Sequence, residues 1–226
     1  MIAVVTPVYG NASTLEALSR RVAGALDGAG LAWTLRFVVD ASPDGSLAVA
    51  QRLSAADPRL SVTSLPVNVG QNQALLAGLA AEERADAWMC LDADLQDPPE
   101  ALPALARRLA RGDVGVVFAG RRGAYEGGLR LATGMVHRAA MARLTGLPPD
   151  AGAFLAMDRV SRDRLLALHP PGIVAGVGVA RIRTASIPVA RATRPSGRSA
   201  WTSPARLRQS GRTLAWAWWA RASARR

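Results

Sequence analysis

The sequence predicts an α/β fold built on a mostly parallel, doubly wound sheet with helices on both faces. Short apolar runs alternate with stretches of helical spacing through residues 2–120. This alternation is typical of parallel strands joined by right-handed helical crossovers. A polar loop follows each of the first four apolar runs, and half of the 226 residues are hydrophobic, which is enough for a substantial core.

Five apolar runs predict five strands, with a helix after each of the first four. The strands are expected over residues 2–8, 34–40, 60–65, 87–91 and 114–120. The helices are expected from a Ser13 or Thr14 cap to about Leu26, from a Ser46 cap to Ala56, from Gln71 to Ala81 and from Pro98 to Arg111. Serine and threonine are favoured at helix caps, and proline is favoured in the first turn.

The pattern becomes less regular after Arg121. We expect helices over 126–144 and 159–168, short strands over 153–157 and 184–189, and an Arg-, Ser- and Gly-rich loop over 190–202. A last helix over 203–219 interleaves arginine with leucine and three tryptophans, as in amphipathic helices at membrane interfaces. The chain therefore divides into a body, residues 1–202, and a basic, Trp-rich tail, residues 203–226.

The net charge of +11 is unevenly distributed. Up to Asp163 there are 16 arginines against 17 acidic residues, and beyond it there are 12 arginines and no acid. Such a segment attracts an anionic membrane surface or a phosphorylated substrate. We expect no nucleic-acid partner, because no recognised motif accompanies the charge. Packing of the tail on the body or on a second subunit is the alternative to membrane binding.

Composition also bears on the cellular compartment. No run of 18 or more uncharged apolar residues occurs, and the first residues lack the basic start of a signal peptide. The single cysteine, Cys90, cannot form a disulfide within the chain and lies in an expected core strand. We therefore expect a cytoplasmic protein, peripheral on the cytoplasmic face of the membrane.

Asp92 and Asp94 stand where the fourth strand ends. If the strand geometry continues, both project to the same side, because side chains alternate along a strand. Such a pair repels unless a cation lies between the carboxylates, and Mg²⁺ takes oxygen ligands of this kind together with substrate phosphates. Loops 6–13, 40–46 and 66–72 fall on the same sheet edge, where open α/β sheets bind ligands. The alternative is a pair of solvated loop carboxylates.

Seven motifs, in order, resemble the family 2 glycosyltransferases, and most closely the polyprenyl-phosphate (dolichol-phosphate mannose synthase-like) sugar transferases. The motifs are Val5–Tyr9, Val39–Ser46, Asn68–Gln71, Leu91–Glu100, Gly120–Arg122, Phe154–Arg159 and Arg194–Thr202. The resemblance covers roughly residues 2–202. It implies a GT-A fold and an inverting, metal-dependent transfer of a hexose from a nucleotide-diphosphate sugar to a polyprenyl phosphate.

The resemblance also implies roles for individual residues. The nucleotide-sugar pocket is expected to comprise Thr6, Pro7, Tyr9, Asp40, Gly70, Gln71, Asp92 and Ala93. Asp94 and Gln96 are expected to hold Mg²⁺ or Mn²⁺, and Asp92, Asp94 and Arg121 are the expected catalytic residues. Arg121, Arg130 and Arg198 are expected to contact the acceptor phosphate.

The nature of the acceptor decides whether a base is needed. A lipid phosphate is already ionised and needs only cations, for which the arginine fork is well suited. A hydroxyl acceptor needs a general base, and Asp97 is the candidate. Two alternatives therefore stay open: a soluble transferase acting on a glycan or small-molecule hydroxyl, and a catalytically weak, nucleotide-sugar-binding scaffold.

The chain departs from the family pattern at four positions. Val39 replaces an acid, Leu155 an arginine, Gly134 a serine beside Thr133, and Ala200 a lysine. These changes touch the expected nucleotide and acceptor contacts and leave the Asp92–Asp94 stretch intact. We interpret them as a changed substrate or a reduced activity.

Overall fold

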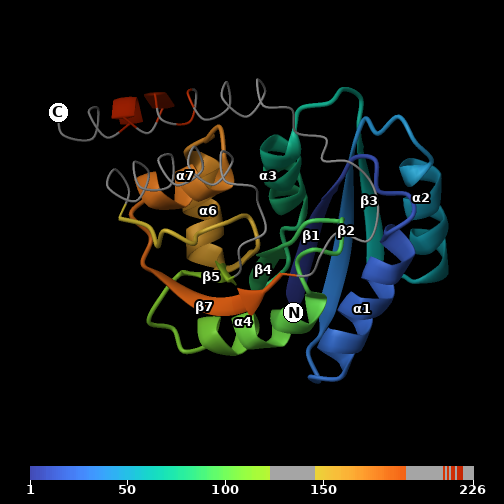
Figure 1. Cartoon of the computed structure of the whole chain (residues 1–226), viewed down its shortest axis with the longest axis horizontal. Helices are drawn as coiled ribbons and strands as arrows, with labels where there is room; N and C mark the ends of the chain where they lie inside the picture. Colours follow the sequence, from blue (N-terminus) through green and yellow to red (C-terminus); the bar gives the residue numbers. More distant parts are fainter. Residues whose placement is uncertain (123–145, 192–210, 212, 214, 217, 221–226) are drawn as a thin grey trace.

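The computed structural model describes residues 1–122, residues 146–191 and seven residues between 211 and 220 (Figure 1). The side chains of Arg121 and Arg122 lie outside this description. The strands are β1 (Ile2–Val8), β2 (Trp33–Asp40), β3 (Leu60–Leu65), β4 (Ala87–Cys90), β5 (Val116–Arg122), β6 (Leu155–Asp158) and β7 (Thr184–Ala190). The helices are α1 (Leu15–Asp27), α2 (Ser46–Ala56), α3 (Gln71–Ala81), the 3-10 turn η1 (Pro99–Ala101), α4 (Leu102–Leu109), α6 (Arg159–Ala167) and α7 (Ile173–Val179).

The seven strands form one sheet in the order β3-β2-β1-β4-β6-β5-β7. Strands β1 to β4 are parallel, as are β5 and β7. Strand β6 lies between β4 and β5 and runs antiparallel to both. The mostly parallel prediction is confirmed, and six strands therefore end at the same edge of the sheet.

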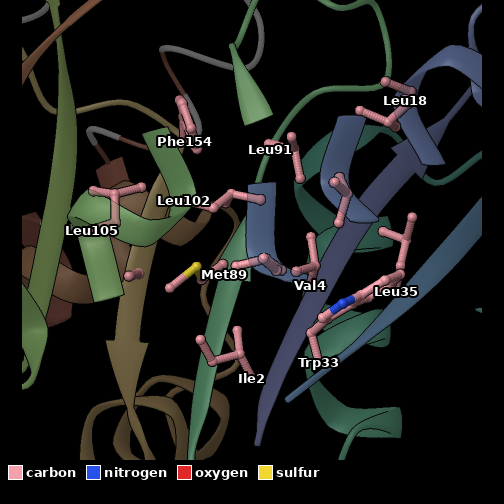
Figure 2. Packing of buried hydrophobic residues seen from close by; sticks show 14 of the residues in the cluster. Ile2, Val4, Leu18, Trp33, Leu35, Met89, Leu91, Leu102, Leu105 and Phe154 are labelled. Atoms are coloured by element: carbon pink, nitrogen blue, oxygen red, sulfur yellow. The ribbon is translucent and has the colours of Figure 1, made fainter. Parts of the chain in front are cut away.

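Side chains that alternate along the strands fill two cores, one on each face of the sheet. Val4 of β1 belongs to the core shared with Leu18 of α1 and Leu102 of α4 (Figure 2). Its neighbour Val5 belongs to the core shared with α3, α6 and α7, which contains Leu75. Because both faces are covered, the strands are apolar nearly throughout, as buried parallel strands are.

The strand and helix predictions agree closely with the structure in the first half of the chain. Helix α3 begins and ends where predicted, and the predicted helix from Pro98 is shortened to η1 and α4. Helix α7 was not predicted. Its sequence, Ile-Val-Ala-Gly-Val-Gly-Val, is apolar on all sides, as in helices that are buried among their neighbours. Such a sequence has no alternation of polar and apolar residues from which a helix could be predicted.

Of the two predicted caps, the one at Thr14 is confirmed in position and the one at Ser46 is wrong. Thr14 is the N-cap residue of α1, but its hydroxyl makes no cap bond and instead donates to the carbonyl oxygen of Ala93 at 2.6 Å. Ser46 is the first residue of α2 and follows the cap Gly45; its Oγ accepts from the backbone N–H of Asn11 at 3.1 Å. Both hydroxyls link loops that are far apart in the sequence instead of closing a helix end.

Two predicted helices lie wholly or largely outside the described residues. Nothing tests the helix over 126–144. In the tail, the seven described residues between 211 and 220 are helical, and Trp218 and Trp219 are exposed, but the full helix over 203–219 stays a prediction. In the part of the chain that the structure describes, no helix is long and apolar enough to cross a membrane.

Candidate active site

Four loops meet where β1 to β4 end: 6–13, 40–46, 66–72 and 92–99. We call them the donor-site loops, after the nucleotide-sugar donor that the sequence resemblance implies for them. Hydrogen bonds join the first loop to the second. The backbone N–H of Gly10 donates to Ser42 Oγ at 2.8 Å, and that of Ala12 donates to Asp44 Oδ2 at 3.1 Å. Partial burial alone would raise the pKa of Asp44, but hydrogen bonds from Ser46, Ser42 and Ala12 outweigh it and lower the pKa to about 2. Asp44 is therefore a stable anion that holds the two loops together.

Asp40 joins the second loop to the third. Its side chain is almost completely buried, and its two oxygens accept from the backbone N–H groups of Val69 at 2.7 Å and Gly70 at 2.8 Å. The amide of Asn68 also donates to the Asp40 carbonyl oxygen at 3.3 Å. The structure thus gives Asp40 a loop-bracing role, and the nucleotide contact implied by the resemblance stays a prediction.

Backbone conformations in these loops are unusual. Gly70 has φ +86° and ψ 155°, a combination that is essentially restricted to glycine. Ala41 and Leu95 have φ of +48° and +62°, in the left-handed region that residues with a Cβ seldom occupy. Strain of this kind persists only where surrounding contacts impose it, and it concentrates at functional sites.

The fourth loop presents its polar side chains on alternate positions. Asp92, Asp94 and Gln96 are half-buried, whereas Ala93 and Leu95 between them are buried. The amide Nε2 of Gln71 donates to Asp92 Oδ1, and the backbone N–H of Gln96 donates to Asp94 Oδ1 at 3.0 Å. The structure therefore brings together the predicted residues Gln71 and Asp92.

The oxygen groups of this loop fit a hard divalent cation. Among the described residues no group of three or more His, Cys, Asp or Glu side chains is arranged to hold a metal ion. Mg²⁺ does not need such a cage, because it is commonly bound by one or two carboxylates together with substrate phosphates. Asp94 supplies a half-buried carboxylate to this loop, and Gln96, two residues on, supplies a half-buried amide oxygen.

The structure adds one residue that the sequence motifs did not reveal. Arg191 directly follows β7, and its Nε donates to Asp97 Oδ1 at 2.7 Å. Its Nη2 lies 3.5 Å from Asp92 Oδ2. Burial opposes the charge of the guanidinium, but attraction by Asp97, Asp92 and Asp94 outweighs it and raises the pKa of Arg191.

Asp97 is poorly suited to the role of general base. Its side chain is only 1% exposed, and its Oδ1 is ion-paired with Arg191. Its Oδ2 accepts from the backbone N–H of Asp92 at 3.3 Å. Both oxygens are therefore occupied in bracing the loop, and deprotonating a substrate hydroxyl would require breaking these contacts.

The remaining predicted site residues differ in burial, and several lie outside the described residues. Thr6 and Pro7 lie within β1 and are buried, and the Thr6 hydroxyl has no hydrogen-bond partner among the described residues. Tyr9 is exposed. The backbone of Arg121 lies in β5, where it pairs with Val189. The side chain of Arg121 lies outside the described residues, as do the residues Arg130, Gly134, Arg198 and Ala200.

Two of the family departures fall in the cores. Val39 is packed in the core beneath α1 and α4, and Leu155 in the core beneath α3. Both side chains are essentially unexposed. The apolar residues at these positions therefore contribute packing, and neither side chain reaches the surface of the donor-site loops.

Comparisons with known proteins agree with this geometry. A family model described as Glycosyl transferase family 2 matches residues 3–159. An undecaprenyl-phosphate 4-deoxy-4-formamido-L-arabinose transferase from Salmonella paratyphi A is 31% identical over 208 residues, covering 89% of this chain and 62% of that protein. The protein of the same name from Pseudomonas paraeruginosa is 40% identical over 116 residues, covering 50% of this chain and 33% of that protein. The chain thus spans less than two thirds of the length of these relatives.

Solved structures show the same fold at low sequence identity. Glucosyl-3-phosphoglycerate synthase from Mycobacterium tuberculosis, with Mn²⁺, UDP and phosphoglyceric acid, aligns with a TM-score of 0.68 at 20% identity, covering 96% of this chain and 76% of that one. A mannosyltransferase from Pyrobaculum calidifontis, with GDP-Man and Mn²⁺, aligns with a TM-score of 0.60 at 18% identity, covering 99% of this chain and 74% of that one. The fold is that of the GT-A glycosyltransferases.

Proposed function

The chain belongs to glycosyl transferase family 2, and from this premise we propose that it transfers a hexose, with inversion, from a nucleotide-diphosphate sugar to a polyprenyl phosphate. The observation that carries the choice of acceptor is the state of Asp97, the candidate base. It is buried and bound on both oxygens. A phosphate acceptor is already ionised and requires no such base, whereas a hydroxyl acceptor does.

The donor-site loops account for binding of the nucleotide sugar. Hydrogen bonds through Asp40, Asp44 and Gln71 hold the loops in one arrangement before the donor arrives. Such preorganisation lowers the entropic cost of binding. Gln71 also orients the carboxylate of Asp92, which is proposed to accept hydrogen bonds from sugar hydroxyls.

Asp94 and Gln96 would hold Mg²⁺ or Mn²⁺, which would offset the negative charge that develops on the departing diphosphate. Both related structures described above contain Mn²⁺, which supports this choice of cation. The residues of the chain bind and orient the donor, while Arg121, Arg130 and Arg198 are proposed to attract the acceptor phosphate through their guanidinium groups.

The basic tail suits a lipid-linked acceptor. Trp218 and Trp219 are exposed, and all 12 charged side chains beyond Asp163 are arginines. Tryptophan favours the membrane–water boundary, and each arginine near an anionic leaflet contributes about 1 kcal/mol. We propose that the tail holds the protein peripherally on the cytoplasmic membrane face, where both substrates meet.

The acceptor is tested with a matched pair of lipids. Purified protein, Mn²⁺ or Mg²⁺ and a panel of labelled UDP- and GDP-sugars are incubated with a short-chain polyprenyl phosphate or with the corresponding polyprenol. Because the site lacks an available base at Asp97, we expect transfer to the phosphate at least about 100-fold faster than to the alcohol. The measurement is the label that enters the organic phase.

Two results would contradict the proposal in different ways. Equal labelling of the polyprenol, or transfer only to a water-soluble hydroxyl, would favour the soluble transferase. Binding of a nucleotide sugar with either metal, but without turnover, would favour the catalytically weak scaffold.

A further inference from the structure

Arg191 is brought to the donor site by a strand remote from it in sequence. Strand β7 is the last strand in the sheet order and runs parallel to β5. Its carboxyl end therefore lies on the same side of the sheet as the donor-site loops. Arg191 is the next residue, and its side chain is only 17% exposed. A guanidinium in such a position is held by specific contacts rather than by solvent.

Two carboxylates contact this one guanidinium, and a third attracts it. Arg191 is hydrogen-bonded to Asp97 and lies 3.5 Å from the carboxylate of Asp92. Asp94 also attracts it and contributes to its raised pKa.

Arg191 and a metal ion would act on the same loop, Arg191 through Asp92 and Asp97 and the metal ion through Asp94 and Gln96. Because the guanidinium and the cation carry charge of the same sign, Arg191 repels a cation bound to this loop. The same guanidinium attracts the diphosphate of a nucleotide. Removing the charge of Arg191 should therefore raise the affinity for the cation and lower the affinity for the nucleotide. A simple loss of structure would lower both affinities.

We propose that Arg191 is a positioning residue that fixes Asp92 and Asp97 and keeps the affinity of loop 92–99 for a free divalent cation low. The loop then binds a divalent cation tightly only when a nucleotide diphosphate is present to supply further oxygen ligands and negative charge. The inference rests on the proposed function in that it takes loop 92–99 to be the metal and nucleotide site.

The variant Arg191→Gln tests the proposal, because glutamine keeps a hydrogen-bonding side chain and removes the charge. Binding of Mn²⁺ alone is measured from the electron paramagnetic resonance signal of the free ion, and binding of UDP and GDP with Mn²⁺ is measured by calorimetry. We expect the variant to bind Mn²⁺ alone about tenfold more tightly and the better of the two nucleotides about tenfold more weakly.

Two further variants separate charge at this position from other effects. Arg183→Gln removes the same charge from an exposed residue at the opposite end of β7 and should change neither affinity. Arg191→Lys keeps the charge and should bind Mn²⁺ alone within about twofold of the unmodified protein. Thermal unfolding is followed for each variant, and Arg191→Met replaces the glutamine variant if that protein does not fold.

The outcomes are distinct. An unchanged or weakened affinity for Mn²⁺ alone in the neutral variant would overturn the role of Arg191 while leaving the proposed function intact. An unmodified protein that binds neither Mn²⁺ nor either nucleotide would overturn the proposed function and this inference with it.

Discussion

Replacing Asp94 with alanine is expected to lower the rate of sugar transfer at least about 100-fold. In other enzymes, removing one group that stabilises the charge of the transition state lowers kcat by about this factor. Asp94 is a half-buried carboxylate of loop 92–99, and it accepts a hydrogen bond from the backbone N–H of Gln96. Its loss removes the charge that would hold the divalent cation against the diphosphate. The measurement is kcat for transfer of the labelled sugar at saturating Mn²⁺.

Asp94 also braces its own loop, so a second variant is needed. Its Oδ1 accepts from the backbone N–H of Gln96, and Asp94→Asn keeps an oxygen there while removing the charge. We expect the same loss of activity with little change in the melting temperature. Asp113→Ala, at an exposed residue before β5 on the opposite sheet edge, is the matched control and should stay within about twofold of the unmodified protein. Retention of more than a tenth of the activity by Asp94→Asn would contradict the assigned role.

Replacing Gly78 with alanine is expected to destabilise the fold by about 1–3 kcal/mol, the usual cost of overpacking a core. Gly78 lies on the buried face of α3, where a Cβ would come 2.4 Å from Val5 Cγ1 of β1 and 2.7 Å from Val38 Cγ2 of β2. Branched valine side chains in a sheet cannot move away easily. The measurement is the free energy of unfolding in urea.

A glycine elsewhere in the chain provides the control. Gly24 lies within α1, is exposed, and a Cβ there would meet no atom within 4 Å. Gly24→Ala should therefore stabilise the protein by about 0.5–1 kcal/mol, because alanine is the better helix former. Stabilisation by Gly78→Ala, as expected for Gly24→Ala, would show that the helix-to-sheet contact at Gly78 is not close.

The alternation of apolar runs and helical stretches was sufficient to predict most of the sheet. In buried parallel strands the apolar run itself marks the element, so β1 to β4 were located from the sequence to within about a residue at each end. The antiparallel insertion of β6 between β4 and β5 could not be predicted, because strand order depends on packing rather than on local pattern. Helix α7 was missed for a related reason, since its uniformly small and apolar residues carry no periodic signal.

The candidate site was predicted less completely than the fold. Motifs located the four donor-site loops, but they could not show how the polar groups are used. The carboxylates of Asp40 and Asp97 are committed to bracing loops, which depends on backbone N–H groups that no motif records. Arg191 was invisible in the sequence because the chain is rich in arginine, and only the end of β7 places it beside Asp97.

Hydrogen–deuterium exchange of the unmodified protein, with and without a bound nucleotide sugar and Mn²⁺, tests the central claim most directly. If the donor-site loops form the nucleotide-sugar site, exchange should slow in loops 6–13, 40–46, 66–72 and 92–99. Segments 28–32 and 82–86, at the opposite edge of the sheet, should be unchanged. Binding that leaves the donor-site loops unprotected, or that protects the opposite edge instead, would contradict the account.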